Sequence, residues 1–163
     1  MVPLVRQARL DECPALTELT MRSKAHWGYD ATFMANVRTD LEMIAGKFMP
    51  GFHVYLLETE NEVIGFYSLR PENVETVTLE DLFIEPKHIG RGYGKQLWDH
   101  SVRVAQSLGF HRVTLISDPY AEPFYARQGA IRFGEIESNA LAGRMLPLMK
   151  YVFDPQRAAK TKL

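Results

Sequence analysis

The chain has 163 residues, 46% of them hydrophobic, and a formal net charge of -1. This length can bury one sizeable core and is short for two ordinary domains, so we expect a single domain over 1–153 and a polar tail over 154–163. The near-neutral charge argues against a nucleic-acid partner, because phosphate backbones are bound by strongly basic surfaces.

No segment of the sequence has the pattern of a membrane helix or a secretory signal. No apolar run approaches the roughly 20 residues that a membrane helix requires, and residues 1–10 lack the apolar core of a signal peptide. The single cysteine, Cys13, cannot form a disulfide within the chain, and the five histidines show no metal-ligand spacing. We therefore expect a cytoplasmic protein with no metal and no membrane partner.

The first part of the chain predicts a short strand and two helices. Residues 4–10 have the length of a strand, and Asp11 can cap a helix that continues to about Ala25. Asp30 can cap a second helix, whose apolar residues recur at helical spacing until Gly46 ends it.

The next segments predict a hairpin and a long strand. Residues 53–59 and 63–69 are rich in β-branched and aromatic residues, and three polar residues separate them. A long β-prone stretch follows over 76–84. Its centre holds two carboxylates, Glu80 and Asp81, which are unusual among apolar neighbours in a strand.

The second half alternates helices with strands. A glycine-rich loop opens a helix that Gly109 ends, and the helix should cross over between two parallel strands. The elements after this helix are the strand 112–117, the short helix 122–128, and the strands 131–136 and 145–153. The pattern predicts a mixed α/β fold with about seven strands and about four helices.

The loop Gly90-Arg91-Gly92-Tyr93-Gly94 is the clearest candidate for a binding site. Alternating glycines between a strand and a helix let backbone N–H groups point into one concavity at a helix N-terminus, where a pyrophosphate is favoured. The glycines alone also fit a turn that binds nothing. A P-loop is excluded because Gln96 follows Lys95, and a Rossmann fingerprint from Gly90 would need glycine or alanine at position 95.

Two motifs resemble those of one known family, the GNAT acetyltransferases. The stretch 79–86, with the sequence LEDLFIEP, and the glycine loop resemble the family's acetyl-CoA-binding motif. Asp118, Ala121, Phe124-Tyr125 and Gly129-Ala130 are similar to its second motif. The resemblance implies the GNAT fold, acetyl-CoA as co-substrate, and direct transfer of the acetyl group to a primary amine of a small molecule or peptide within a ternary complex.

The resemblance also implies a set of cofactor contacts. They are Leu82, Phe83, Ile84, Ile89, Gly90, Arg91, Gly92, Tyr93, Gly94, Lys95, Asp118 and Phe124. The family usually has Gln or Arg where this chain has Ile89, so one side-chain anchor is absent, and the family more often has Asn at the position of Asp118. Backbone amides should still hold the pyrophosphate, with Arg91 or Lys95 supplying charge.

Two residues are candidates for the chemistry. Strand alternation lets only one of Glu80 and Asp81 face the cofactor, and resemblance to the polyamine-type acetyltransferases favours Glu80 as the base. Burial among apolar neighbours would suit a base near neutral pH. Tyr125 corresponds to the family's tyrosine that protonates the leaving thiolate. A salt-bridged carboxylate at position 80, Asp81 as the base, and a merely packed Tyr125 remain alternatives.

The acceptor side is less defined. Trp27 and Tyr29 resemble the family's acceptor-side loop, and Asp81 is a further candidate for substrate binding. Arg144, in the segment 138–147, can either face an acceptor carboxylate or pin that segment. A catalytically silent acyl-CoA-binding module is the rival function, a longer acyl chain or a protein N-terminus are rival substrates, and the resemblance leaves a homodimer open.

Overall fold

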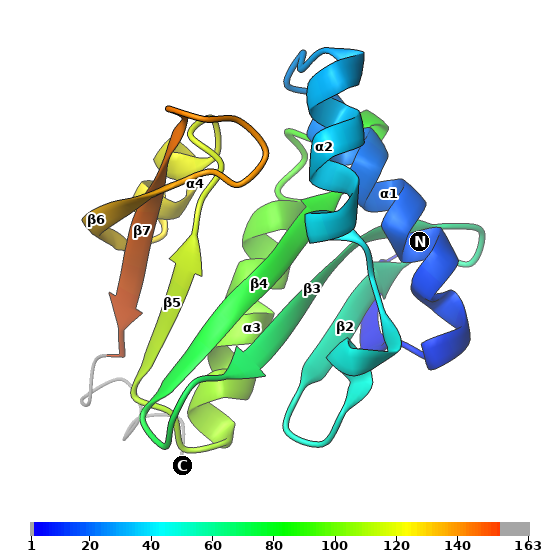
Figure 1. Cartoon of the computed structure of the whole chain (residues 1–163). Helices are drawn as coiled ribbons and strands as arrows, with labels where there is room; N and C mark the ends of the chain where they lie inside the picture. The colour runs from blue at the N-terminus through cyan, green and yellow to red at the C-terminus, as the bar shows by residue number, and fades with distance from the viewer. Residues whose placement is uncertain (1, 154–163) are drawn as a thin grey trace.

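The computed structural model describes residues 2–153, so the tail predicted over 154–163 lies outside the described residues. The chain forms a seven-stranded sheet in the order β1-β2-β3-β4-β5-β7-β6 (Figure 1). The strands are β1 (Leu4–Gln7), β2 (His53–Glu58), β3 (Val63–Pro71), β4 (Thr76–Ile84), β5 (Arg112–Ile116), β6 (Ile131–Glu137) and β7 (Met145–Val152). Neighbouring strands are antiparallel except β4 and β5, whose parallel pairing confirms the predicted crossover.

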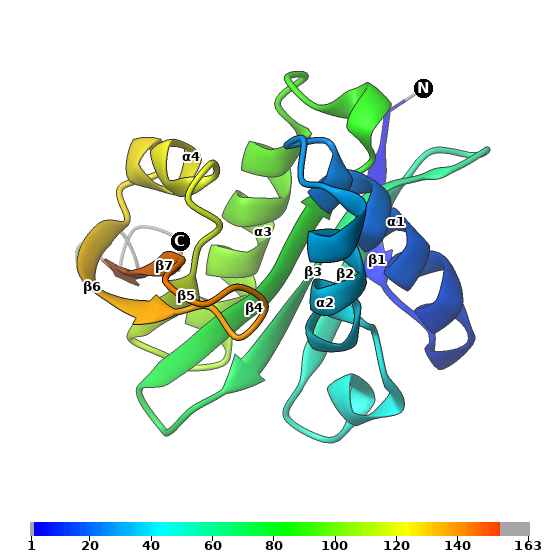
Figure 2. The ribbon, with the colours of Figure 1, turned by 45° about the horizontal axis from the view of Figure 1, so that its top comes forward.

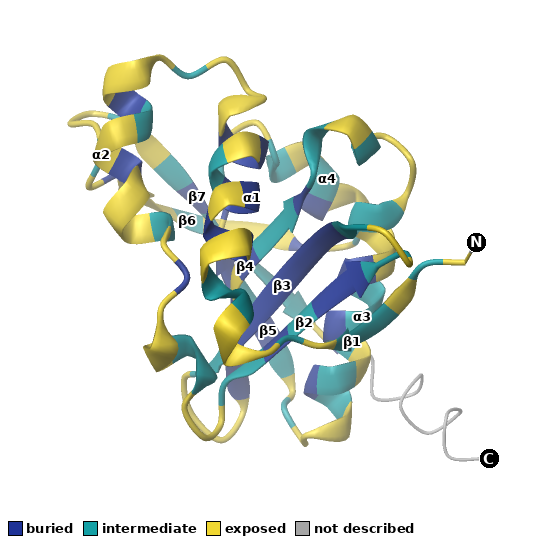
Figure 3. Cartoon of the chain, turned by 90° about the vertical axis from the view of Figure 1, so that its right-hand side faces the viewer, coloured by how far each residue is buried: buried dark blue, intermediate teal, exposed yellow. Residues whose placement is uncertain are grey.

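Four α-helices cover the two faces of the sheet (Figure 2). They are α1 (Cys13–Ala25), α2 (Ala31–Leu41), α3 (Tyr93–Ser107) and α4 (Glu122–Arg127). On one face, Leu16 and Leu19 of α1 pack with Leu56 and Phe66. On the other face, Leu97 and Trp98 of α3 lie in the larger core cluster, which also contains residues of β2 to β5, β7 and α4. The central strand β3 is therefore buried on both faces (Figure 3).

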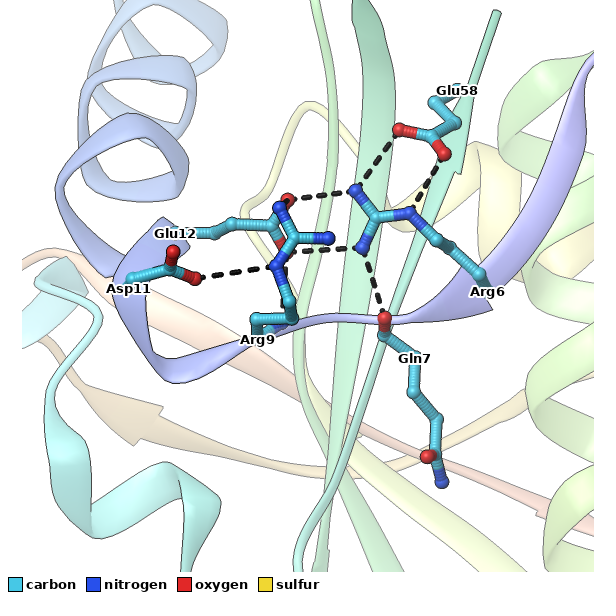
Figure 4. Close-up of polar contacts among 6 residues, drawn as sticks. All are labelled: Arg6, Gln7, Arg9, Asp11, Glu12 and Glu58. Carbon is cyan, nitrogen blue, oxygen red and sulfur yellow. Dashed lines mark hydrogen bonds and ion pairs between the residues drawn. The ribbon is translucent and has the colours of Figure 1, made fainter.

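The first helix begins later than the sequence predicted. Asp11 does not cap it; a 3-10 turn over Leu10–Glu12 comes first, and α1 starts at Cys13. The Glu12 carboxylate accepts the Arg9 backbone N–H at 2.7 Å and also binds Arg6, whose guanidinium bridges to Glu58 on β2 (Figure 4). Arg6 of β1 thus joins Glu58 of β2 and Glu12 at the start of α1 in one ion-pair network.

The second helix is shorter than predicted. The Asp30 carboxylate accepts the Phe33 N–H at 2.8 Å, which confirms the predicted cap. The helix ends at Leu41 rather than at Gly46. The cause is Met43, whose side chain is buried in the α1 core and whose backbone N–H donates to the Thr17 hydroxyl at 3.0 Å.

A bulge in β4 determines the shape of the functional end of the sheet. Ser68 pairs with Asp81 and Leu69 pairs with Leu79, so Glu80 is an extra residue opposite β3. β4 and β5 pair over only three residue pairs, starting at Thr76. Beyond these pairs the two strands separate (Figure 1). The separation opens a gap in the sheet at the carboxyl ends of both strands.

Among the described helices, none is long and apolar enough to cross a membrane.

Candidate active site

A cleft of about 920 Å³ lies where β4 and β5 separate. Its lining has two parts of different chemistry. The glycine-loop half comprises Ile84, Ile89, Gly90, Gly92, Gly94, Lys95, Phe124 and Gln128. The ion-pair half comprises Lys24, Trp27, Asp40, Glu80, Asp118, Ser138 and Arg144. Leu82, Phe83 and Tyr125 also line the cleft.

Two of the three glycines in the loop have a backbone conformation that favours glycine. Gly90 and Gly92 have φ angles of +83° and +86°, in the left-handed region that favours glycine, and Gly92 directly precedes α3. A Cβ added at either residue would meet no heavy atom of the described chain within 4 Å, so the loop is open to a ligand. The first N–H groups of a helix have no partner within the helix and favour an anion, and this loop leads into the 15-residue helix α3.

The charged side chains beside this loop are held loosely. Lys95 lines the cleft and pairs with Asp99 at 2.6 Å on the exposed surface of α3. Arg91 is exposed and does not line the cleft, and its only described partner is His88 at 3.5 Å. Tyr93 does not line the cleft either, and it packs edge-on against His88, which does. The side chains of Arg91 and Tyr93 are therefore outside the cleft lining, and their predicted contact with the cofactor stays a prediction.

The bulge brings both strand carboxylates to one face, which corrects the alternation that we expected. Asp81 accepts a hydrogen bond from Ser68 at 2.5 Å, and Glu80 accepts one from Arg70 at 2.5 Å. Ser68 and Arg70 are two residues apart on β3 and so share a face. One extra residue in β4 rotates the second carboxylate onto that same face.

The two carboxylates nevertheless have different surroundings. Glu80 lines the cleft with its side chain 25% exposed. The prediction that it is buried among apolar neighbours is therefore wrong. The hydrogen bond to Glu80 raises the pKa of Arg70. Asp81 is buried, binds Lys47 at 2.7 Å and does not line the cleft. This placement contradicts a direct contact between Asp81 and the substrate.

Tyr125 lies at the cleft wall with its ring packed in the core. It meets Trp98 and Phe124 edge-on, with ring centroids 5.7 and 5.1 Å apart. Burial first, and then the carboxylates of Asp81 and Asp118, raise the pKa of Tyr125 well above its ordinary value of 10.0. Its hydroxyl has no hydrogen-bond partner among residues 2–153, so a protonated phenol is free to donate toward the cleft.

Asp118 is the centre of a cluster that sequence reasoning did not find. Its carboxylate binds the Lys24 ammonium, the Tyr29 hydroxyl at 2.9 Å, the Arg144 guanidinium at 3.3 Å and the Tyr120 N–H at 2.8 Å. Burial alone would raise the pKa of Asp118, but the hydrogen bond and charge of Lys24 lower it overall. The predicted cofactor contact at Asp118 is therefore a carboxylate already engaged by the protein.

The aromatic residues of the α1–α2 loop support this cluster. Trp27 stacks on Tyr120 at 5.5 Å and lines the cleft, whereas Tyr29 stacks on Phe33 at 4.1 Å and does not. The Arg144 guanidinium lies 5.1 Å from the Tyr29 ring centre. Arg144 thus connects the segment 138–147 to the α1–α2 loop, and it also lines the cleft.

Lys24 is the functional candidate that the sequence reading missed. It follows Leu16, Thr20 and Ser23 on the buried stripe of α1, and a lysine at such a position requires a partner. That spacing was the available signal. Among residues 2–153 there is no group of three or more His, Cys, Asp or Glu side chains placed to hold a metal ion.

The fold and the cleft together define an acyltransferase that uses coenzyme A: a split mixed sheet, a glycine loop at a helix N-terminus, and a carboxylate and a phenol beside the split. The model of the acetyltransferase (GNAT) family matches residues 14–130, and the chain belongs to this family. The resemblance of the two motifs is thereby confirmed.

Individual relatives agree with this assignment. Peptidyl-lysine N-acetyltransferase YjaB of Salmonella typhimurium is 28% identical over 155 residues, covering 91% of this chain and 97% of the relative. The PaiA N-acetyltransferase of Thermoplasma acidophilum, solved with coenzyme A, has a TM-score of 0.73 at 14% identity, with 94% and 100% of the two chains covered. The YncA structure of Salmonella typhimurium, solved with acetyl-CoA, has a TM-score of 0.68 at 19% identity, with 94% and 95% covered. These structures confirm the predicted seven-stranded fold.

Proposed function

We propose that this protein transfers the acetyl group of acetyl-CoA to a primary amine of a peptide or small molecule by direct attack in a ternary complex. The observation that supports this most is that Glu80 and Tyr125, which can perform the two proton transfers, line the same cleft as the glycine loop. A lysine side chain is a candidate acceptor, since the relative YjaB is named a peptidyl-lysine N-acetyltransferase.

The cofactor's pyrophosphate would bind the glycine loop. Backbone N–H groups at Gly90 to Gly94 and the N-terminus of α3 supply partial positive charge there without any charged side chain. The open space beside Gly90 and Gly92 fits this use, because the group must approach the backbone closely. Ile84, Ile89 and Phe124 offer the apolar contacts beside it.

The chemistry would be divided between two residues. Glu80 takes a proton from the acceptor ammonium, directly or through water, and the amine nitrogen attacks the thioester carbonyl carbon. As the new C–N bond forms, the C–S bond breaks and the electron pair remains on sulfur, while the nitrogen releases its second proton to water. Tyr125, kept protonated by its raised pKa, donates its proton to that thiolate.

The test is an acetyl-CoA thiol-release assay over a panel of amines and lysine peptides, with mass spectrometry of each acceptor. We expect amine-dependent thiol release and an acetylated product. Tight CoA binding without acetylation of any acceptor would instead favour a silent acyl-CoA-binding module.

A further inference from the structure

Within the ion-pair half, the cluster around Asp118 holds two cations and one carboxylate. Lys24 and Arg144 both bind Asp118, so two cations share one carboxylate. The side chains of Lys24 and Asp118 are each only 10% exposed, and that of Arg144 is 13% exposed. A partly buried site with one uncompensated positive charge is complementary to an anion.

The spare donors of this cluster are reachable from the cleft. Arg144 Nη2 donates to the Tyr29 hydroxyl at 2.6 Å and to Asp118, while Arg144 Nε and Nη1 have no partner among residues 2–153. Lys24 Nζ, which has three protons, binds Asp118 alone. No buried side-chain nitrogen of the described chain lacks a partner, so the unpaired Arg144 Nε and Nη1 are not fully buried. Lys24 and Arg144 both line the cleft.

The cluster is also preorganised. The Arg144 guanidinium lies over the Phe33 ring at 5.0 Å as well as over Tyr29, and these two rings stack on each other. Binding an anion there therefore requires little ordering of the arginine side chain. The cofactor's phosphates have a separate site at the start of α3, so the free donors remain available for the other substrate.

We propose that the acceptor amine carries a carboxylate nearby, and that Arg144 and Lys24 bind this carboxylate while the amine meets Glu80. The inference rests on the proposed function and specifies its substrate class. Glu80 offers negative charge and the cluster offers positive charge on the lining of the same cleft, which matches a zwitterionic acceptor. The carboxylate can be that of a free amino acid or that of an acidic residue beside a lysine in a peptide.

Matched acceptors test this proposal. One pair is an amino acid and its carboxamide; the other is a lysine peptide with Glu or Gln beside the lysine. The parent protein should prefer the carboxylate member of at least one pair by about 10- to 100-fold in kcat/KM, the range of one or two charged hydrogen bonds. The pair that shows the preference identifies the source of the carboxylate.

Variants then connect the preference to the cluster. Arg144→Gln should reduce the ratio toward one by slowing the carboxylate acceptor alone, and Arg144→Lys should retain part of the preference. Lys24→Met gives a second test, in case Arg144→Gln folds poorly. Arg132→Gln is the matched control, because Arg132 pairs with Glu122 and Glu135 on exposed β6, outside the cleft lining. CoA affinity, measured by calorimetry, should be unchanged in all of these variants.

Two results overturn the inference while acetyl transfer stands. One is equal acetylation of both members of each pair by the parent protein. The other is an Arg144→Gln variant that slows both members equally and leaves the ratio unchanged. If an amine of the wider panel is acetylated but none of these four acceptors is, the inference fails alone. If no amine of the panel is acetylated although CoA binds, the proposed function fails and the inference fails with it.

Discussion

The two halves of the cleft are built from different parts of the chain. The glycine-loop half presents backbone, with the exposed Lys95 in its lining and the exposed Arg91 beside it. The ion-pair half presents side chains, with Asp118 holding Lys24 and Arg144. A backbone site tolerates the loss of any one neighbouring side chain, whereas a site of shared ion pairs is sensitive to each member. The difference implies opposite responses to substitution, which the following experiments examine.

The largest expected effect is at Glu80. Glu80→Gln should lower turnover by about 10- to 1000-fold, because the amine loses its proton acceptor. The loss should shrink as the assay pH rises, since the amine then deprotonates without help, and CoA affinity should hardly change. Turnover across the range from about pH 6 to 9 measures this. Parental activity of the variant over the whole range would place the base elsewhere.

Tyr125→Phe should slow turnover with a different pH response. The missing proton belongs to the thiolate, so raising the pH should not restore the rate as it does for Glu80→Gln. In the parent protein the raised pKa of Tyr125 keeps the phenol protonated, so its titration should not reduce activity up to pH 10, its ordinary pKa. An identical pH rescue of both variants would show that the two residues do not act on opposite ends of the transfer.

Asp118→Asn tests the ion-pair half through stability. Removing the shared carboxylate leaves two buried cations unpaired and should cost about 3 kcal/mol of unfolding free energy near pH 7. Because the folded-state pKa of Asp118 is lowered, its contribution is present above the ordinary pKa of 3.8 and is lost as the pH falls through the lower, folded value. Urea denaturation at neutral and acid pH measures both. Asp99→Asn, at an exposed pair, is the control and should cost less than about 1 kcal/mol.

Gly92→Val tests the glycine-loop half. A β-branched residue is strained at a φ of +86°, so the loop should lose the conformation that points its N–H groups at the ligand, and CoA affinity should fall by at least about 10-fold. Gly109→Val carries the same strain, at a φ of +89° after the end of α3, and should lose stability but not CoA affinity. Equal CoA affinity of Gly92→Val and the parent in calorimetry would remove this loop from the site.

The smallest effects should come from the side chains around the loop. Arg91→Ala should change CoA affinity less than about threefold, because its guanidinium is exposed and outside the cleft lining. Ile89→Arg should not weaken CoA binding, since it adds a cation where the family usually has a polar residue. A loss as large as that of Gly92→Val at either position would show that side chains, not backbone, hold the pyrophosphate.

The sequence predicted the glycine-loop half better than the ion-pair half. The loop and its helix depend on local chemistry, namely glycines at alternate positions and a helix that follows directly, and all seven strands are local β-prone segments. The Lys24–Asp118 pair joins residues 94 positions apart, and the Arg144–Tyr29 contact joins residues 115 apart. Local sequence patterns do not indicate contacts between residues so far apart in the chain.

The two strand carboxylates show the same limit at shorter range. Alternation is correct for a regular strand, but the bulge at Glu80 depends on the register between β4 and β3, which the residues of β4 alone do not specify. The exposure of Glu80 and its pairing with Arg70 follow from that register. The residues of β4 alone therefore do not distinguish Glu80 from Asp81 as the base, and family resemblance is what favours Glu80.

The central claim, that the cleft binds acetyl-CoA at the glycine loop, is tested most directly by thermal unfolding with and without the cofactor. A ligand at 100 times its dissociation constant adds about 2.7 kcal/mol. For a domain of this size the midpoint should therefore rise by roughly 5 to 10 °C with acetyl-CoA or CoA. At the same concentration Gly92→Val should show a clearly smaller rise. A well-folded parent protein whose midpoint does not move at millimolar acetyl-CoA or CoA would contradict the account.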